Sequence, residues 1–192
     1  GARQAVVRQF ESLGQNVIVI KSNNPTVTFE MDEAKDLIDR VQGLDYATPV
    51  VRTDASIRWR RINGELDIIG VNSDFPIIRD HDIVSGNFFS SLHVKQRSPV
   101  AIVGYNVGKS LMNGRSPVGQ TISIDGISYR ILGVLEEKGA GQADGIDDKI
   151  ILPYTTALKI THKRNVDEIW GKSDSPENAS LAIVQLGRIF KR

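Results

Sequence analysis

The stretch that decides the fold runs from Pro99 to Ile160 and reads PVAIVGYNVGKSLMNGRSPVGQTISIDGISYRILGVLEEKGAGQADGIDDKIILPYTTALKI. It holds four short apolar runs that are rich in β-branched residues and bounded by Gly, Asp or Pro, which is the pattern of strands. A compact, mainly β unit is therefore predicted here. The four runs are Val100–Val103, Ile122–Ile124, Ile127–Val134 and Ile150–Leu152.

The chain before this stretch predicts both helix and strand. Apolar residues three and four positions apart predict a helix over Ala2–Leu13, ended by Gly14. Val17–Ile20 lacks the polar alternation of a half-exposed strand, so it is predicted to be a strand buried on both faces. Thr28 is expected to cap a second helix, which has acidic residues in its first turn and is ended by Gly43. Its acidic residues are Glu30, Asp32 and Glu33, and its apolar stripe is Ala34, Leu37, Ile38 and Val41.

A hairpin is predicted next. Tyr46–Arg52 and Ala55–Ile62 have the composition of strands, and Glu65–Val71 is predicted to return beside them. Between them, Asn63-Gly64 is the residue pair that most strongly favours a two-residue hairpin turn. These segments complete a β-α-β-β unit.

The C-terminal segment is predicted to add a strand over Val166–Gly171 and then a helix. Ser175, Pro176 and Glu177 have the pattern of a capped helix start. The apolar stripe of this helix is Ala179, Ala182, Ile183, Leu186, Ile189 and Phe190. The predicted fold class is therefore α+β with two subdomains: residues 1–79 and 165–192 form a β-α-β-β...β-α lobe from both chain ends, and residues 80–164 form a mainly β lobe inserted between them.

Composition excludes several classes of function. Lys and Arg number 24 and Asp and Glu number 23, so the formal net charge of +1 provides no broad field for nucleic acid or anionic lipid. The chain has no cysteine, which excludes disulfides and zinc-thiolate sites. Its apolar runs fall well below the roughly 18 residues of a membrane helix. It begins without a methionine or a signal peptide and ends on Phe190-Lys191-Arg192, so we expect it to be a segment of a longer protein.

Three sets of residues suggest a ligand, and each has a simpler interpretation. Gly104–Ser110 follows a strand and opens a helix, but it has three residues between its glycines where a phosphate loop needs four. Asp144, Asp147 and Asp148 lack the alternating ligands of a calcium loop, so a solvated loop is favoured. The histidines are too widely spaced to suggest a metal pair. They are His81, His93 and His162. The sequence thus predicts neither a cofactor site nor a metal site.

No catalytic residue is predicted either. The chain has no Gly-x-Ser-x-Gly elbow, and its serines and histidines follow no recognisable triad order. Basic residues surround Trp59, as in a small nucleic-acid surface, but strand alternation places Arg58 and Arg60 on one face and Trp59 with Arg61 on the other. A solvated edge with one packed tryptophan is therefore favoured. Trp170 is expected to belong to the core.

Four pieces of the central stretch, in this order, carry a resemblance. They are Pro99–Gly104, Ser116–Ile122, Tyr129–Leu135, and Asp147-Asp148 leading into Ile151–Ala157. Together they resemble the extracytoplasmic core domain of MacB-type ABC transporter permeases. Three flanking segments also match that family, so the resemblance covers nearly the whole chain. They are Glu11–Asn16, Val71–Phe75 and Ile83–Phe89, although the family prefers a basic residue at Asn87.

This resemblance implies a domain on the outer side of a cell membrane, held between two transmembrane helices of its own full-length chain. The lobe of residues 1–79 and 165–192 is then the membrane-proximal, porter-like subdomain. The implied partners are a second permease subunit, identical or paralogous, a cytoplasmic ATP-binding subunit or domain and, in many MacB-type systems, a periplasmic adaptor protein. The implied function is transmission of an ATP-driven conformational change for export or mobilisation of a drug, peptide or lipoprotein. The domain itself is expected to be non-catalytic, without a cofactor.

The alternative hypothesis is a secreted, non-transport binding module, or a small hydrolase whose site follows no recognised pattern. It differs from the permease hypothesis in one simple respect. Apolar spans of roughly 20 residues on both sides of the segment in the full reading frame favour the permease, and their absence would exclude it.

Overall fold

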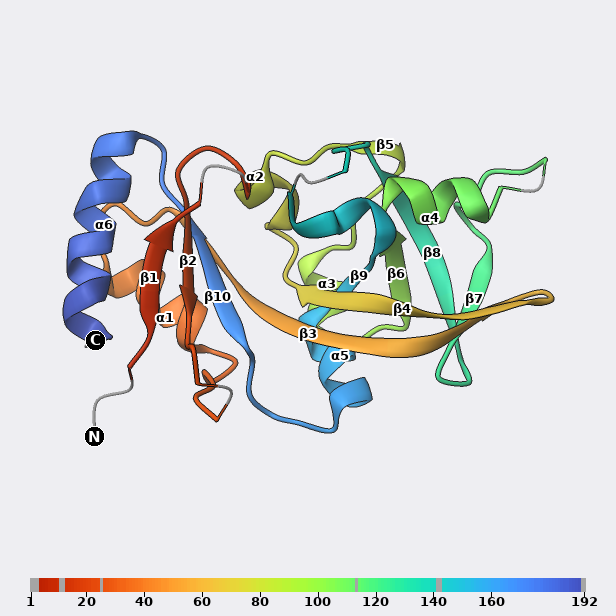
Figure 1. Cartoon of the computed structure of the whole chain (residues 1–192), viewed down its shortest axis with the longest axis horizontal. Helices are drawn as coiled ribbons and strands as arrows, with labels where there is room; N and C mark the ends of the chain where they lie inside the picture. The colour runs from red at the N-terminus through yellow and green to blue at the C-terminus, as the bar shows by residue number, and fades with distance from the viewer. Residues whose placement is uncertain (1–3, 11–12, 25, 113, 141–142, 191–192) are drawn as a thin grey trace.

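The computed structural model of the protein describes residues 4–10, 13–24, 26–112, 114–140 and 143–190. Within these residues, ten strands form one mixed sheet along an elongated molecule (Figure 1). The strands are β1 (Val6–Gln9), β2 (Val17–Lys21), β3 (Tyr46–Trp59), β4 (Ile62–Val71), β5 (Ile83–Gly86), β6 (Val100–Val103), β7 (Thr121–Ile124), β8 (Ile127–Leu135), β9 (Ile150–Pro153) and β10 (Glu168–Lys172). Their order is β1-β2-β10-β3-β4-β9-β6-β8-β5, and β7 pairs with both β3 and β8.

Helices pack on the sheet along its whole length (Figure 1). They are α1 (Glu33–Arg40), α2 (Phe75–Arg79), α3 (Ser91–Lys95), α4 (Tyr105–Ser110), α5 (Tyr154–Thr161) and α6 (Pro176–Ile189), with a 3-10 segment η2 (Ala143–Asp148). In the described part of the chain, none of them has both the length and the hydropathy that crossing a membrane requires. The predicted α+β fold class is confirmed.

The first strand replaces a predicted helix. Val6–Gln9 pairs antiparallel with β2, and Val7 lies opposite Ile20. Val7 is buried whereas Arg8 is exposed, which is the two-residue period of a strand. The helix predicted over Ala2–Leu13 is therefore wrong where the chain is described; residues 2, 3, 11 and 12 lie outside the described residues. Strand β2 supplies backbone hydrogen-bond partners for Val6–Gln9, and the spacing of apolar residues within this segment does not reveal them.

Strands β1, β2, β10 and the first part of β3 form what we call the terminal half, because both chain ends contribute to it. Helices α1 and α6 cover one face of this sheet (Figure 1). The predicted cap of α6 is confirmed, since Ser175 Oγ accepts a hydrogen bond from the Asn178 amide at 3.1 Å. The other face packs on α2, where Phe75 and Ile78 contact the same core as Trp170.

The predicted start of α1 is wrong. The helix begins at Glu33 with Asp32 as its N-cap residue, and Thr28 lies outside it. Phe29 forms a bridge with Val166, with N–O distances of 3.0 and 2.8 Å in the two directions. The segment before the helix is therefore held extended by a distant part of the chain. The helix ends at Arg40, before the predicted Gly43.

Strand β3 is continuous where two strands were predicted, and its hairpin turn is Arg60-Arg61 instead of Asn63-Gly64. Asn63 and Gly64 lie within β4, opposite Arg58 and Ile57. Burial alternates along the end of β3, with Ala55, Ile57 and Trp59 facing the core. This alternation fixes the register with Ile62 opposite Trp59, and Arg60 adopts a φ of +55° in the turn.

The second half is a closed ring of six strands, which we call the barrel. The end of β3 pairs with β4, β4 with β9, β9 with β6, β6 with β8, and β8 with β7, which pairs back to β3. The β4–β9 and β6–β8 pairs are parallel and the others antiparallel. The strands predicted in the stretch Pro99–Ile160 are therefore confirmed. The predicted division into residues 80–164 and the remainder stays a prediction, and the β3–β4 hairpin pairs with strands of both parts.

Candidate functional site at the junction of the two halves

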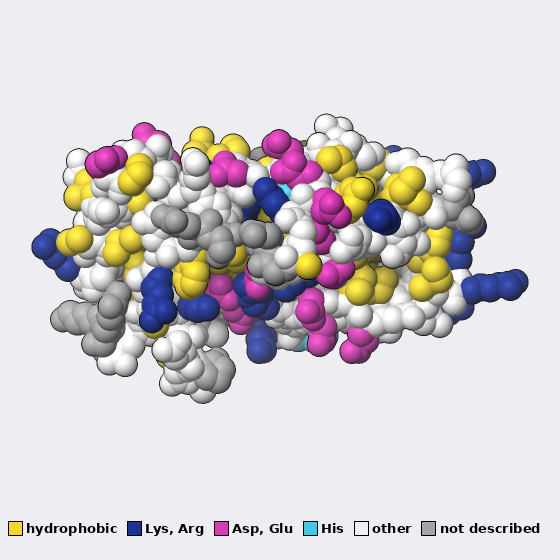
Figure 2. Space-filling model, turned by 45° about the horizontal axis from the view of Figure 1, so that its top comes forward, with side chains coloured by type: hydrophobic (Ala, Val, Ile, Leu, Met, Phe, Trp, Pro, Cys, Tyr) yellow, Lys and Arg dark blue, Asp and Glu magenta, His cyan; other side chains and the backbone are white. Residues whose placement is uncertain are grey.

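Charged side chains gather where the terminal half meets the barrel. Figure 2 shows acidic and basic groups side by side across the middle of the molecule. We call six of these residues the junction network. They are Arg52, Arg79, Asp80, Asp144, Glu168 and Lys172.

Arg52 joins three elements at the centre of this network. It lies on β3, its Nε contacts Glu168 Oε2 of β10 at 2.6 Å, and its Nη2 contacts Asp144 Oδ2 of η2 at 2.7 Å. Burial by itself lowers the pKa of Arg52, but the carboxylates of Glu168 and Asp144 more than offset burial, so the pKa is raised. The guanidinium is thus held charged between the terminal half and the barrel.

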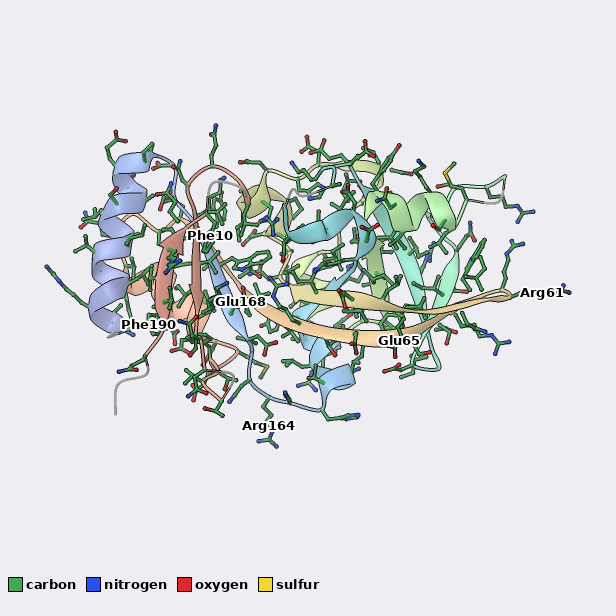
Figure 3. The ribbon with its side chains drawn as sticks, in the orientation of Figure 1. Phe10, Arg61, Glu65, Arg164, Glu168 and Phe190 are labelled. Atoms are coloured by element: carbon green, nitrogen blue, oxygen red, sulfur yellow. The ribbon has the colours of Figure 1, made fainter. Side chains whose placement is uncertain are left out.

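Glu168 also fixes the tryptophan beneath it. Its Oε1 accepts a hydrogen bond from Trp170 Nε1 at 3.0 Å, while Oε2 binds Arg52. Figure 3 shows Glu168 between Phe190, toward one end of the molecule, and Arg61 at the other end, on the side of Phe190. Trp170 is fully buried, as the sequence predicts, and its polar atom is satisfied.

Arg79 is a buried cation at the end of α2. Its side chain is 1% exposed, and its Nε donates to the Leu13 carbonyl at 2.8 Å. The guanidinium carbon lies 4.6 Å from the Trp170 ring centre and 5.7 Å from that of Phe75. Burial lowers the pKa of Arg79 to about 10. The group therefore keeps its charge at neutral pH, and its contacts attach the backbone of Leu13 to α2.

Asp80 and Lys172 tie three loops to β10. Lys172 Nζ contacts Asp80 Oδ2 at 3.1 Å and the Gln15 carbonyl at 2.9 Å. Lys138 Nζ donates to the Asp80 carbonyl at 2.9 Å. Asp80 has a left-handed backbone with φ of +48°, at the point where the chain leaves α2 for the barrel. The chain is therefore held at Asp80 by Lys172 of the terminal half and by Lys138, which follows β8 of the barrel.

The three histidines belong to three different parts of the fold. His81 is buried beside the junction, with Nε2 2.8 Å from the Glu136 carbonyl. Burial lowers the pKa of His81, and the charges of Lys138 and Arg79 lower it further. His93 completes a capping box with Ser90 at the start of α3, and His162 follows α5. No group of three His, Cys, Asp or Glu residues in the described part of the chain has the arrangement of a metal site.

The three loop aspartates also point to different partners. Asp144 pairs with Arg52, and Asp148 Oδ1 accepts from Asn106 Nδ2 at 2.9 Å. Asp147 is 5% exposed and accepts from the amides of Lys138 and Gly139 at 2.9 and 2.8 Å. Each of these three aspartates is therefore held by a specific partner, which a solvated loop would not require.

Gly104 forms the turn between β6 and α4, as predicted, and packing explains the glycine. A Cβ at Gly104 would lie 2.2 Å from the Ile146 carbonyl oxygen. The Gly104 amide donates to the Lys149 carbonyl at 2.9 Å. Lys109, on α4, has its Nζ 5.7 Å from the Tyr105 ring centre.

Trp59 is packed in the barrel, as the sequence predicts. It is 7% exposed, and its Nε1 donates to Gln120 Oε1 at 2.9 Å. Arg60 lies in the hairpin turn, and its guanidinium carbon is 5.0 Å from the Trp59 ring centre. The expected separation of Arg60 and Trp59 onto opposite strand faces is therefore wrong, because the strand ends before Arg60.

Sequence reasoning missed the junction network. Arg52 follows an apolar run of β3, and Arg79 follows the apolar residues of α2. A single charged residue directly after an apolar run is therefore the signal in the sequence that could have indicated these two residues. Their partners lie far away in sequence, since Arg52 and Glu168 are 116 positions apart.

Solved structures of transport proteins share this fold. The periplasmic region of MacB from Actinobacillus actinomycetemcomitans matches with a TM-score of 0.77 over 95% of this chain and 87% of that chain, at 17% sequence identity. The extracellular domain of the noncanonic ABC-type transporter YknZ from Gram-positive bacteria matches with a TM-score of 0.68 over 85% of this chain and 83% of that chain, at 16% identity. The fold is therefore one found in extracytoplasmic domains of ABC transporters.

Curated relatives are longer proteins. The macrolide export ATP-binding/permease protein MacB of Bdellovibrio bacteriovorus is 30% identical over 92% of this chain and 30% of its own length. The pyoverdine export ATP-binding/permease protein PvdT of Pseudomonas aeruginosa is 27% identical over 88% of this chain and 26% of its own length. The chain thus spans less than a third of each of these relatives.

The family model of the MacB-like periplasmic core domain matches residues 1–189. The chain belongs to this family, which confirms the resemblance read from its sequence. It is a periplasmic or extracellular domain of a MacB-type ABC transporter permease.

Proposed function

We infer that this domain transmits the conformational change of an ATP hydrolysis cycle across the membrane, for export or mobilisation of a drug, peptide or lipoprotein. The observation that carries this proposal is the continuous strand β3, which pairs with β10 in the terminal half and with β4 and β7 in the barrel. A displacement of the terminal half therefore reaches the barrel through one strand. The junction network supports the proposal because it couples the two halves through side chains.

The proposed partners follow from the names of the relatives. Each is named as a single ATP-binding/permease protein. We propose that transmembrane helices of the full-length chain flank this domain, and that a cytoplasmic ATP-binding domain or subunit drives it. A homodimer or a pair of paralogous permeases is the proposed assembly, with a periplasmic adaptor as a further partner. The start of β1 and the end of α6 support this, because they lie at the same end of the molecule (Figure 1).

The test uses the full-length transporter with spin labels on Arg61, at the barrel end, and Ser180, on α6. Labelled protomers are mixed with excess unlabelled protomers, so that distances within one protomer are measured. We expect the distance distribution to differ between the nucleotide-free and ATP-bound states. A control pair within the terminal half, Lys35 and Ser180, should not change. Identical distributions for Arg61 and Ser180 in both states would contradict the proposal.

We further propose that the domain has no catalytic role and no affinity for ATP, because Gly104–Ser110 is one residue short of a phosphate loop. Calorimetric titration of the isolated chain with Mg-ATP is expected to be flat. Saturable binding that disappears in Lys109→Ala would contradict this part of the proposal and favour the alternative of a secreted, non-transport binding module or small hydrolase.

A further inference from the structure

The barrel has a hollow at the end far from the chain ends, between the β3–β4 hairpin and α4. Its volume is about 260 Å³. Figure 2 shows hydrophobic side chains on the surface toward this end of the molecule. Pockets that enclose whole drug-sized ligands measure roughly 300–1,000 Å³, whereas apolar cavities of roughly 150 Å³ hold one benzene ring. The hollow is therefore large enough for one ring or a branched alkyl group of a larger molecule.

The walls of the hollow are mostly hydrocarbon. Ile57 and Trp59 of β3, Val107 of α4 and Ile122 of β7 line it, and each of these is at most 8% exposed. The one polar atom of the Trp59 ring is already bonded to Gln120, so the ring presents only carbon to a ligand. Ile62, which is 56% exposed, stands at the rim. Covering such a surface with an apolar group lowers the free energy, because apolar area is removed from water.

A glycine inside a strand keeps the hollow open. Gly64 lines it from β4 and lies opposite Ile57, so both residues face the same side of the hairpin. A Cβ at Gly64 would meet no heavy atom within 4 Å, and the residue has no left-handed φ that would require glycine. Neither packing nor backbone conformation explains this glycine. Glycines inside strands often mark a bulge, a tight bend, or a place where a ligand or another backbone approaches closely. The register at Gly64 has no bulge and no backbone lies near it, so close approach of a ligand is the explanation that fits.

One charged group faces the hollow. Asp148 is the only charged residue among the described residues that line it. Its Oδ1 accepts from Asn106 Nδ2, and no lysine or arginine in the described chain is placed to form an ion pair with it. Arg60 lies over the Trp59 ring but does not line the hollow. The rim therefore complements a cation.

We propose that this hollow binds the apolar end of a lipophilic amine, with one ring or branched alkyl group between Trp59, Val107 and Gly64 and the ammonium group facing Asp148. The proposal does not rest on the transport function, because the hollow, the glycine and the carboxylate are features of the barrel alone.

The test uses three probes with the same apolar body: 3-phenylpropylammonium, 3-phenylpropanol and 3-phenylpropanoate. The chain has two tryptophans, so its two indole N–H signals in an NMR spectrum report separately on the hollow and on the junction. We expect the Trp59 signal, assigned with Trp59→Phe, to shift in a saturable way while the Trp170 signal stays fixed. The ammonium should bind most tightly and the carboxylate most weakly, with about three- to tenfold between successive probes.

Two variants and a matched control separate the parts of the proposal. Gly64→Leu fills the hollow and should weaken all three probes by about tenfold or more. Gly187→Leu, on α6 at the other end of the molecule, also places its side chain in open space and should change nothing. Asp148→Asn should keep the alcohol bound and remove the preference for the ammonium.

Three results would overturn the proposal. They are the absence of any saturable shift of the Trp59 signal, unchanged binding in Gly64→Leu, and equal affinities of the wild-type chain for the three probes. The first two exclude the site, and the third excludes an amine as its ligand. None of them bears on transmission between the two halves, which is tested on the full-length transporter.

Discussion

Strand β4 carries two glycines on the same side, and their surroundings differ completely. At Gly70, near the junction, a Cβ would lie 2.6 Å from Ala157 Cβ and 2.9 Å from Tyr154 Cα, both on α5. At Gly64, near the hairpin tip, it would contact nothing within 4 Å. One glycine lets a helix pack on the strand, and the other leaves a hollow. The barrel is thus filled at the junction and open at its far end.

The two tryptophans mark these ends, and replacing them gives the largest expected effects. Trp170→Ala should lower the free energy of unfolding by about 3–5 kcal/mol, because a fully buried ring is lost and Arg79 loses its stacking partner. Trp59→Ala should lower it by about 2–3 kcal/mol, because the ring already borders an open space. Urea denaturation followed by circular dichroism measures both. Equal losses would show that the two ends are packed alike.

Adding one methyl group to each glycine of β4 sharpens the comparison. Gly70→Ala should destabilise the fold by about 1–3 kcal/mol, since α5 or the strand must move. Gly64→Ala should leave the stability unchanged or raise it by up to about 1 kcal/mol, because alanine restricts the unfolded chain more than glycine does. Thermal unfolding of both variants beside wild type is the measurement. A loss at Gly64 as large as at Gly70 would contradict the open hollow.

Removing the central cation tests the junction at a smaller scale. Arg52→Met should cost about 1–2 kcal/mol, because Glu168 and Asp144 lose their partner while the site stays partly solvated. Arg58→Met, at the exposed hairpin, should stay within about 0.5 kcal/mol. Part of the difference should disappear in molar salt, which screens partly exposed pairs. If both variants behave alike at low salt, the ion pairs of Arg52 do not stabilise the junction.

The pH dependence gives the smallest expected effect. Burial lowers the pKa of His81 in the folded chain, so the unfolded chain takes up a proton first as the pH falls. Above about pH 6.5, His81 is neutral in both states and contributes no pH dependence to the free energy of unfolding. Below that pH its contribution lowers the free energy of unfolding, until the folded form is protonated as well. His81→Gln should flatten this part of the stability curve. A curve between about pH 7.5 and pH 5 that is the same in variant and wild type would remove His81 as the cause.

The sequence predicts the barrel strands well because they are buried on both faces, so continuous β-branched runs such as Val100–Val103 have no competing interpretation. It fails at β1, because an edge strand depends on its neighbour as much as on its own pattern. It fails at the hairpin, because alternate burial of Ile57 and Trp59 places the turn at Arg60-Arg61 despite the strong local preference of Asn63-Gly64.

The candidate site is harder to predict than the fold. Arg52, Glu168 and Asp144 are brought together only by strand pairing between distant parts of the chain. The hollow depends on a glycine that looks like a turn residue in the sequence and lies within a strand in the structure. In both cases the chemistry is created by the register of β3, which no local pattern reveals.

The place of β10 has a consequence for how the chain is made. Glu168–Lys172 lies between β2 and β3, pairing with both. During synthesis from the N-terminus, β2 and β3 are made long before β10. The edges that pair with β10 therefore stay unpaired until nearly the whole domain has been synthesised. Until then, both strands expose unpaired edges that can recruit other chains. A version that stops at Arg164 should therefore self-associate, and light scattering on adding a Glu168–Lys172 peptide would reveal whether the missing strand alone prevents it.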